Sequence, residues 1–489
     1  MIPTIQEAKK YENNYKIVPI AKEIYSDFTT PIKVLRQLKK VSQHCYLLES
    51  VENQEKWGRY TFLGYKPKLC VTCMNGILKV TDVDGSLIKE EKVTHPGGYI
   101  KEMLAEYKSP KVDGMPSFTG GLVGYFAYDY IKYSEPKLNL DAADEEGFND
   151  VDLMLFDKVI AFDNVKQKLI VIANAKTDNL EENYIKAVEE IEEIINIIRY
   201  GEEEQTQPGK MTSEYRALFD REAFCDMVNT AKKHIFEGDI FQVVLSNRLD
   251  ADFTGSLLDT YRVLRTINPS PYMFYFSGDD IEVAGASPET LVKLENGVLH
   301  TFPLAGTRPR GKSPKEDKEL EEGLLADEKE RAEHNMLVDL GRNDLGRISR
   351  FGSVEVEKYM SIERYSHVMH IGSTVRGEIR EDKCQLDAMD AVLPAGTLSG
   401  APKIRACEII NKLENNKRGI YGGAIGYIDF TGNLDTCIAI RIAYKKNGKV
   451  FVRSGAGIVA DSVPENEYQE CINKAKAVMS AIEKSEEVK

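Results

Sequence analysis

The chain has 489 residues, a net charge of -14 and 42% hydrophobic residues, a composition typical of a soluble globular protein. The negative charge argues against nucleic acid as the main partner, because no basic run offsets it. No apolar run approaches the length of a membrane span, and the first residues lack the apolar core of a signal peptide. Eight cysteines are scattered along the chain without a disulfide framework, so we expect reduced thiols in a cytoplasmic protein without a membrane partner.

Short apolar runs separated by turns fill residues 1–200 and predict strands of antiparallel sheets. The dipeptide Asp84-Gly85 is typical of a hairpin turn, and the glycines of 120–130 predict a strand packed closely against another backbone. A helix is expected over 178–200. The polar segment 200–215, which contains proline and glycine, predicts a boundary between an N-terminal domain (1–205) and a second domain (215–489).

The second half mixes helical and strand patterns. Helices are expected over 221–237, 255–266 and 402–414 and at the C-terminal end, with strands between them. Hairpin-like strands with interspersed helices favour an α+β fold, an antiparallel β-sandwich flanked by helices, over a doubly wound parallel sheet.

A further helix is predicted over 327–344, where Leu337 and Leu340 recur at helical spacing. Glu330 and Glu333 share the face of those leucines, because residues i, i+3, i+7 and i+10 lie on one side. Burial of even a neutral polar group costs about 2–7 kcal/mol unless a partner satisfies it. The two carboxylates therefore either bind a partner on that face or belong to a solvated first turn, where the helix dipole favours acids.

The last helix repeats this arrangement and favours the first alternative. Pro464 is a start signal, Glu467 and Glu470 are again three residues apart, and Lys474 follows on the same face. Four converging carboxylates need a cation, and oxygen ligands of this kind suit Mg²⁺ better than zinc or iron. Such an ion keeps open positions for an anionic substrate, while Lys474 would neutralise one carboxylate.

Residues 306–313, GTRPRGKS, match the phosphate-loop pattern G-x-x-x-x-G-K-[ST]. A phosphate loop uses successive backbone N–H groups, and Pro309 removes one of them. The segment that follows is too charged for the buried helix that such a loop opens. We therefore interpret the match as coincidental.

Two polar residues stand in apolar surroundings. Arg441 interrupts a predicted strand, 437–443, where an inward guanidinium needs a partner such as a substrate carboxylate. His370 lies between apolar neighbours and is either a structural histidine or a catalytic one. Gly455 and Gly457 favour tight strand packing, or a close approach of backbone N–H groups to an anionic ligand.

From residue 47 to the last helix, the chain resembles the chorismate-utilising enzymes, and most closely the large subunits (component I) of anthranilate synthases. The resemblance rests on many separate motifs, among them NPSPYMF (268–274), GASPE (285–289), PLAGTRPRG (303–311) and PAGTLSGAPK (394–403). It implies a Mg²⁺-dependent lyase that aminates chorismate with ammonia and eliminates pyruvate to give anthranilate, the first committed step of tryptophan biosynthesis.

The resemblance also implies roles for individual residues. Glu289 would protonate the departing C4 hydroxyl, and catalytic roles also fall to His370, Thr397 and Gln242. The residues implied in substrate binding are Gly306, Thr307, Tyr421, Arg441, Gly455, Gly457 and Lys474. The metal would be held by Glu330, Glu333, Glu467 and Glu470, in agreement with the separate argument from helix faces.

Two positions distinguish the branches of this family. Ala305 stands where aminodeoxychorismate synthases often carry a nucleophilic lysine, and alanine cannot form a covalent intermediate. Gln242 stands where isochorismate and salicylate synthases carry a lysine that activates water; glutamine is a poor base, so ammonia fits better. Component I of aminodeoxychorismate synthase, which serves folate synthesis, is the alternative, and a non-catalytic tryptophan-sensing protein is a third hypothesis.

The resemblance further implies feedback inhibition by tryptophan. The residues that match the family's tryptophan pocket are Leu48, Glu49, Ser50, Pro271, Tyr272, Met273, Phe274 and Cys437. The chain lacks a G-x-C-x-G nucleophile loop, so ammonia is expected from a glutamine amidotransferase partner, component II.

Overall fold

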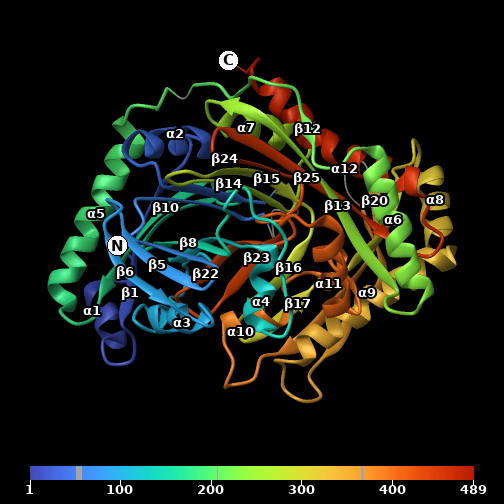
Figure 1. Cartoon of the computed structure of the whole chain (residues 1–489). Coiled ribbons are helices and arrows are strands. Elements are labelled where there is room, and N and C mark those ends of the chain that lie inside the picture. Colours follow the sequence, from blue (N-terminus) through green and yellow to red (C-terminus); the bar gives the residue numbers. More distant parts are fainter. Residues whose placement is uncertain (51–57, 206, 365–367, 489) are drawn as a thin grey trace.

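The computed structural model describes residues 1–50, 58–205, 207–364 and 368–488, and the strands in these ranges form two antiparallel sheets (Figure 1). The first sheet has the order β1 (Ile17–Tyr25), β10 (Lys168–Lys176), β9 (Lys158–Asp163), β3 (Tyr60–Tyr65), β2 (Cys45–Glu49), β14 (Tyr272–Ser277), β15 (Glu282–Ser287), β24 (Ile442–Lys446), β25 (Lys449–Ile458), β13 (Gln242–Thr254) and β11 (Lys210–Met211), and β12 (Arg216–Ala217) and β21 (Gly400–Ala401) also pair with β13. The second has the order β18 (Leu304–Pro309), β20 (Val368–Glu378), β17 (Val298–Thr301), β16 (Thr290–Glu295), β23 (Leu434–Ile438), β22 (Ala424–Asp429), β7 (Gly121–Phe126), β8 (Val151–Phe156), β4 (Leu69–Met74), β5 (Ile77–Asp82) and β6 (Leu87–Lys92), and β19 (Glu355–Arg364) pairs with β20.

Helices cover the outer faces of both sheets (Figure 1). They are α1 (Ile5–Ala8), α2 (Pro31–Val41), α3 (Gly97–Ala105), α4 (Ile131–Ser134), α5 (Leu180–Tyr200), α6 (Arg221–Phe236), α7 (Leu258–Ile267), α8 (Pro314–Ala326), α9 (Glu328–Gly346), α10 (Gln385–Val392), α11 (Lys403–Glu414) and α12 (Pro464–Ser485), with short 3-10 turns at Lys9–Tyr11, Tyr128–Tyr130 and Gly396–Leu398. The predicted helices are therefore confirmed, and the one expected from residue 255 begins at Leu258.

The interior of the sandwich is an aromatic core shared by the two sheets. Tyr46 and Phe274 enter it from the first sheet, Tyr125 and Phe156 from the second, and all four are buried. The rings of Tyr46 and Phe156 meet edge to face with centroids 4.7 Å apart. Helices α2, α5, α7 and α12 pack on the outer face of the first sheet, and α3, α9 and α10 on that of the second. The predicted α+β fold, a β-sandwich flanked by helices, is confirmed.

Two of the links through which the chain crosses from one sheet to the other are neighbours. One joins β15 to β16 and contains Glu289; the other joins β23 to β24 and contains Arg441. The links lie side by side, because the amide of Ile438 donates to the carbonyl of Glu289 (3.0 Å) and the amide of Ala286 donates to that of Arg441 (3.2 Å). Both polar side chains are thus fixed where the two sheets meet.

The predicted strand across 437–443 is wrong. The first sheet takes over from the second between Ile438 and Ile442, and Arg441 has a left-handed φ of 53°. The apolar residues before and after Arg441 are both buried, but they belong to strands of different sheets. In the sequence they therefore resemble one continuous apolar strand.

Close backbone approach explains the glycines of β7. A Cβ atom on Gly124 would lie 2.0 Å from the carbonyl oxygen of Asp152, and one on Gly121 would lie 2.1 Å from that of Ile428. Any side chain at either position would separate β7 from its neighbours, so the expectation of tight strand packing is confirmed. The turn at Asp84-Gly85 also joins β5 to β6 as expected, with Gly85 at φ 78°.

The proposed boundary at 205–215 separates segments that share both sheets. Each sheet contains a block of strands from before the boundary and a block from after it, and the two blocks join where β2 pairs with β14 in the first sheet and where β7 pairs with β22 in the second. Hydrophobic contacts in the interior likewise join residues from both segments. The division into two domains stays a prediction.

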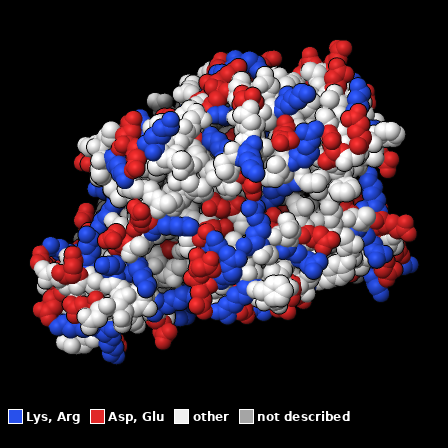
Figure 2. Space-filling view, turned by 60° about the horizontal axis from the view of Figure 1, so that its bottom comes forward, with Lys and Arg blue, Asp and Glu red and all other residues white. Residues whose placement is uncertain are grey.

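The remaining expectations from composition concern surface and compartment. Acidic and basic side chains are interspersed on the face shown in Figure 2, consistent with a surface that does not concentrate positive charge there. All eight cysteines belong to the described residues and are free thiols. Among the helices in the described ranges, none has the length and apolar character needed to cross a bilayer.

Candidate active site

Glu289 is a half-buried carboxylic acid at the crossing of the two sheets. The hydroxyl of Thr397 donates a hydrogen bond to its Oε1 at 3.2 Å. Burial raises the pKa of Glu289 to about 7, and the Thr397 hydrogen bond and the charges of Arg441 and Lys474 lower it only in part. A carboxyl with this pKa is largely protonated just below neutrality, which is what a general acid requires.

His370 lies on β20, next to Gly306 and Thr307 of the neighbouring strand β18. Its Nδ1 is 2.7 Å from the carbonyl oxygen of Gly306 and 3.2 Å from the hydroxyl of Thr307. A carbonyl oxygen only accepts, so Nδ1 carries the proton and Nε2 of the neutral ring has the lone pair. Burial lowers the pKa of His370, and Arg441 lowers it further, so the ring is neutral at physiological pH.

Two glycines of β25, Gly455 and Gly457, leave the backbone exposed along one wall of the site. A Cβ on Gly457 would lie 2.6 Å from Nε2 of Gln242, and one on Gly455 would lie 2.9 Å from the hydroxyl of Tyr421. The ammonium of Lys474 donates to the carbonyl of Gly455 at 3.0 Å. These five predicted site residues therefore occupy one wall, where β13, β25 and α12 meet.

Helix α9 directs its first carboxylates toward β18. Asp327 caps the helix by accepting from the amides of Lys329 and Glu330. Arg308 donates to Glu330 at 3.3 Å and to Asp327 at 3.0 Å. A Cβ on Gly306 would lie 3.0 Å from Oε2 of Glu330, so the glycine in this motif makes room for that carboxylate.

The carboxylates of α9 and α12 influence one another. The pKa of Glu333 is raised by burial and then by the negative charges of Glu330 and Glu470. The pKa of Glu467 is raised by burial and then by Glu470. Glu470 itself pairs with Lys474 at 2.6 Å.

This donor set fits a hard divalent cation. All the ligand atoms are carboxylate oxygens, and two of the acids are destabilised as anions by their neighbours, which a bound cation would reverse. Within the described ranges, no three of these carboxylates bring oxygen atoms within 4.8 Å of one another. The two helices are therefore close enough to interact electrostatically, but the ligands are not drawn together around one point.

Two cations near the carboxylates were not singled out from the sequence. Arg308 binds Glu330, and the charge of Lys329 lowers the pKa of both Glu333 and Glu467. The sequence offers only the position of Arg308, two residues after Gly306, as a signal. Lys329 directly precedes Glu330, and its spacing does not indicate an inward direction.

The phosphate-loop match at 306–313 does not form a phosphate cradle. Residues up to Pro309 belong to β18, with Arg308 opposite Met369 and Pro309 opposite Val368. The remainder leads into Ser313, which caps the surface helix α8. The interpretation of the match as coincidental agrees with this backbone.

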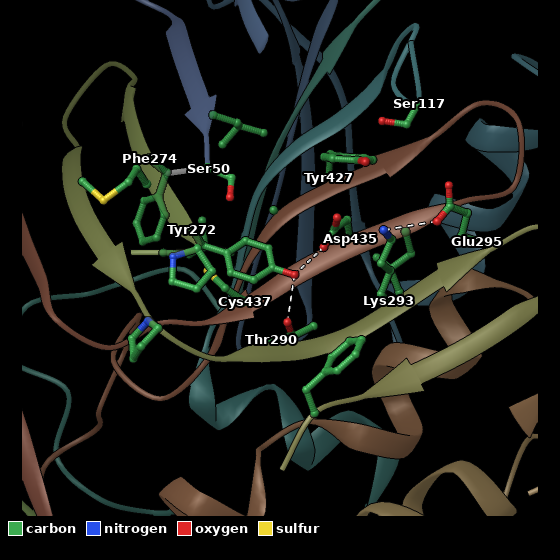
Figure 3. A pocket seen from close by; sticks show the side chains of 18 of the residues that line it. Ser50, Ser117, Tyr272, Phe274, Thr290, Lys293, Glu295, Tyr427, Asp435 and Cys437 are labelled. Atoms are coloured by element: carbon green, nitrogen blue, oxygen red, sulfur yellow. Dashed lines mark hydrogen bonds and ion pairs between the residues drawn. The ribbon is translucent and has the colours of Figure 1, made fainter. Parts of the chain in front are cut away.

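A cavity of about 520 Å³, larger than the space of about 50 Å³ beside Glu289, runs along β16 and β23 (Figure 3). All eight residues predicted for the tryptophan pocket line it, namely Leu48, Glu49, Ser50, Pro271, Tyr272, Met273, Phe274 and Cys437. Figure 3 shows the hydroxyl of Tyr272 reaching across to Thr290 (3.0 Å) and Asp435 (2.8 Å).

Glu49 contributes to this cavity differently from its neighbours. Its carboxylate forms an ion pair with Arg265 at 2.5 Å and accepts a hydrogen bond from Tyr261 at 2.5 Å. Both partners lie on α7, so this side chain fixes the end of β2 to that helix. The carboxylate is therefore already engaged outside the cavity.

Comparisons with known proteins cover nearly the whole chain. Residues 43–480 match the family of chorismate binding enzymes. Anthranilate synthase component 1 of Acetivibrio thermocellus is 47% identical, with 100% of this chain and 99% of that protein covered. The corresponding protein of Aquifex aeolicus is 46% identical, with 99% and 98% covered.

Solved structures support the same assignment. The crystal structure of anthranilate synthase component I from Streptococcus pneumoniae superimposes with a TM-score of 0.74 at 39% identity, covering 93% of this chain and 98% of that one. The menaquinone-specific isochorismate synthase of Escherichia coli has a TM-score of 0.70 at 18% identity, with 98% of each chain covered, and shows the fold alone. With its family match over residues 43–480 and relatives that align over their full length, the chain belongs to the chorismate binding enzyme family.

Proposed function

We propose that this chain is the chorismate-aminating subunit of an anthranilate synthase and converts chorismate and ammonia to anthranilate and pyruvate. The observation that carries the proposal is the buried carboxyl of Glu289, with a pKa near 7, between Thr397 and the positive charge of Arg441. Such an acid can protonate a poor leaving group next to a cation that holds the anionic substrate.

The substrate chorismate carries two carboxylates, and the site has separate groups for each. Arg441, Tyr421 and the backbone at Gly457 hold the enolpyruvyl carboxylate, because the guanidinium and the backbone amide donate to its oxygens. Mg²⁺, held by Glu330, Glu333, Glu467 and Glu470, supplies positive charge for the ring carboxylate when it is bound.

Proton transfers divide between two residues. Glu289 gives its proton to the C4 oxygen as ammonia attacks C2, so the hydroxyl leaves as water. His370, with Nε2 unprotonated, takes the C2 proton when pyruvate is eliminated and the ring becomes aromatic. Gln242 lines the same wall as Gly457 and, as a poor base, does not activate water in place of ammonia.

Ammonia comes from a separate glutamine amidotransferase subunit in this proposal. The printed names of the relatives call them component 1, which supports the existence of a further component. The complex works in the cytoplasm, where the free thiols of the chain stay reduced.

The first test uses the purified chain with chorismate, Mg²⁺ and excess ammonium, following anthranilate fluorescence and pyruvate release together. Equal amounts of both products are expected. Consumption of chorismate without anthranilate would instead assign the chain to the aminodeoxychorismate or isochorismate branch. Ala305, buried on β18 and without a nucleophile, supports the first outcome over a covalent route.

The proposal also includes tryptophan as an inhibitor that binds in the larger cavity. Leu48, Met273 and Phe274 offer apolar surface, while Asp435 and Lys293 provide charges of both signs for an amino acid. The cavity and the active site share two strands, since Thr290 and Cys437 line the cavity directly beside Glu289 and Ile438. A ligand in the cavity that displaces Thr290 would therefore also displace Glu289, the adjacent residue in the chain.

We expect tryptophan to inhibit the chain and to raise its melting temperature, because a ligand bound only by the folded state stabilises it. Cys437→Met adds bulk to the cavity wall. A loss of binding free energy of the size that overpacking costs in a core, about 1–3 kcal/mol, corresponds to about 5–150-fold weaker binding. Inhibition curves and thermal shifts measure both effects. Cys225→Met on the half-exposed face of α6 is the matched control and should behave as wild type. An unchanged activity in excess tryptophan would remove inhibition from the proposal.

A further inference from the structure

A small cavity lies beside Glu289, on the side of α9. Its volume is about 50 Å³, and its walls come from α9, from the link between β17 and β18, and from the 3-10 turn that carries Thr397. Glu289 and Thr397 line it together with Thr301 and Gly341. Pockets that bind small organic ligands measure about 300–1,000 Å³, so this cavity cannot hold the substrate itself.

Thr301 brings an unsatisfied hydroxyl to this cavity. The residue is only 7% exposed, and its Oγ1 is shielded from bulk solvent and has no hydrogen-bond partner among the described residues. Buried polar groups in native proteins are almost always satisfied, and where no protein group serves, ordered water does. The hydroxyl therefore indicates a water position.

Gly341 keeps the space next to that hydroxyl open. A Cβ at this position would lie 3.0 Å from Oγ1 of Thr301 and 3.7 Å from Pro303. Glycine in the interior of a helix is unfavourable relative to alanine, so its place in α9 has a local reason. One water needs about 10–15 Å³ of such space, and the cavity thus has room for water beside both Thr301 and Glu289.

We propose that this cavity is a water site of the active centre, which receives the departing C4 oxygen of chorismate as water and returns a proton to Glu289. The inference rests on the proposed anthranilate-forming function. Thr397 occupies Oε1 of Glu289, so the acidic proton resides on Oε2. Glu289 lines the cavity, so water there lies beside the acid and can return a proton to it.

The step balances without any further reactant. The C2–N bond forms as the C4–O bond breaks, and the proton of Glu289 moves to the departing oxygen, so one water is released. The new ammonium group at C2 then loses a proton to solvent, and the cavity water accepts a proton from solvent as it passes one to the Glu289 carboxylate, so no hydroxide remains. The acid is ready for the next turnover.

The first test is a high-resolution crystal structure of the full chain. Ordered water is expected within hydrogen-bond distance of both Glu289 and Thr301, and Gly341→Ala should displace it. A cavity without water in the wild-type crystal would overturn the inference, whatever product the enzyme forms. The stability of Thr301→Val gives an independent reading: removal of a hydroxyl from a dry cavity raises the melting temperature, whereas removal from a hydrated one does not.

The second test is kinetic and uses matched glycines of α9. Gly341→Ala is expected to lower kcat by about tenfold, a fraction of the 10²–10⁴-fold that general acids contribute, with the KM for chorismate unchanged. Its pH profile should also shift, because loss of water raises the pKa of Glu289 further. Gly346→Ala, where a Cβ meets nothing within 4 Å, should match wild type.

These experiments distinguish failure of the proposed water site from failure of the proposed anthranilate-forming function. A wild-type chain that makes no anthranilate would refute the proposed function, while the crystal structure still decides whether the cavity holds water. A wild-type chain that makes anthranilate, with Gly341→Ala equal to it in kcat and pH profile, would refute the role of the cavity alone.

Discussion

Replacement of Glu289 by glutamine is expected to lower kcat for anthranilate formation by about 10²–10⁴-fold, the contribution of a general acid. Glutamine keeps the shape and the hydrogen bond from Thr397 but has no acidic proton for the departing hydroxyl. The KM for chorismate should change little, because the proposed mechanism assigns substrate binding to Arg441 and the metal ligands. Steady-state fluorescence assays at saturating ammonium measure both constants.

The matched control is Glu295→Gln, at the other end of the strand that follows Glu289. Its side chain is 44% exposed and pairs with Lys293, so its loss should leave kcat within about twofold of wild type, as for most surface substitutions. A Glu289→Gln enzyme with near-normal kcat would remove the acid role from this residue.

The acid role of Glu289 should also be visible in the pH dependence of kcat of the wild-type enzyme. The acid form of Glu289 is required, so kcat should fall as the pH rises through and above about 7, measured at a constant concentration of free ammonia. Bound chorismate is an anion and would hold this pKa at or above that of the free enzyme. Glu289→Gln should lose this limb of the profile.

The stability of the wild type should also fall as the pH rises, whereas Glu289→Gln should not show this loss. Because folding raises the pKa of Glu289 from 4.5 to about 7, the contribution of this group to stability is fully present below pH 4.5 and is lost as the pH rises through 7. Glu289→Gln avoids that loss, so at pH 8 the variant should be more stable than wild type, by up to about 3 kcal/mol. Urea unfolding at pH 5 and pH 8 measures the difference.

Much of the fold follows from local pattern. Alternating apolar runs, the Asp84-Gly85 turn and the closely packed glycines of β7 each have a physical cause that acts within a few residues. The assignment of strands to two sheets does not, because it depends on pairings such as that of β2 with β14, more than two hundred residues apart. The crossing at Arg441 was missed for the same reason.

The part of the candidate site that could be predicted from the sequence is the part that depends on which residues share a helix face. The placement of Glu330 and Glu333 on the inner side of α9 needs only the helical period. The pairing of Arg308 with Glu330, and the ion pair that draws Glu49 away from the larger cavity, depend on contacts between distant segments. Spacing in the sequence contains no signal for either contact, so the structure was needed to identify both.

The second large effect is expected at the carboxylates. Removal of divalent cations with EDTA should abolish anthranilate formation, and Mg²⁺ should restore it. Glu333→Gln should lower activity by about a hundredfold or more at every Mg²⁺ concentration, because loss of a ligand weakens both the metal and the charge it supplies to the substrate. Activity against Mg²⁺ concentration measures the effect.

Glu328→Gln provides the control, since Glu328 lies in the same first turn of α9 but is exposed to solvent. It should retain wild-type activity and Mg²⁺ response. Full activity after exhaustive dialysis against EDTA would contradict the metal assignment for all four carboxylates.

Thermal stability in the absence of metal should separate a ligand from a merely structural acid. The pKa of Glu333 is raised by burial and by the charges of Glu330 and Glu470, so its ionised form disfavours the folded state without a cation. Glu333→Gln should therefore melt at a higher temperature than wild type in EDTA, and unlike wild type it should gain little from added Mg²⁺. A variant that is both inactive and less stable in EDTA would indicate that Glu333 supports the fold instead. In the expected case, the repulsion between the carboxylates of α9 and α12 is the feature that a bound cation would relieve.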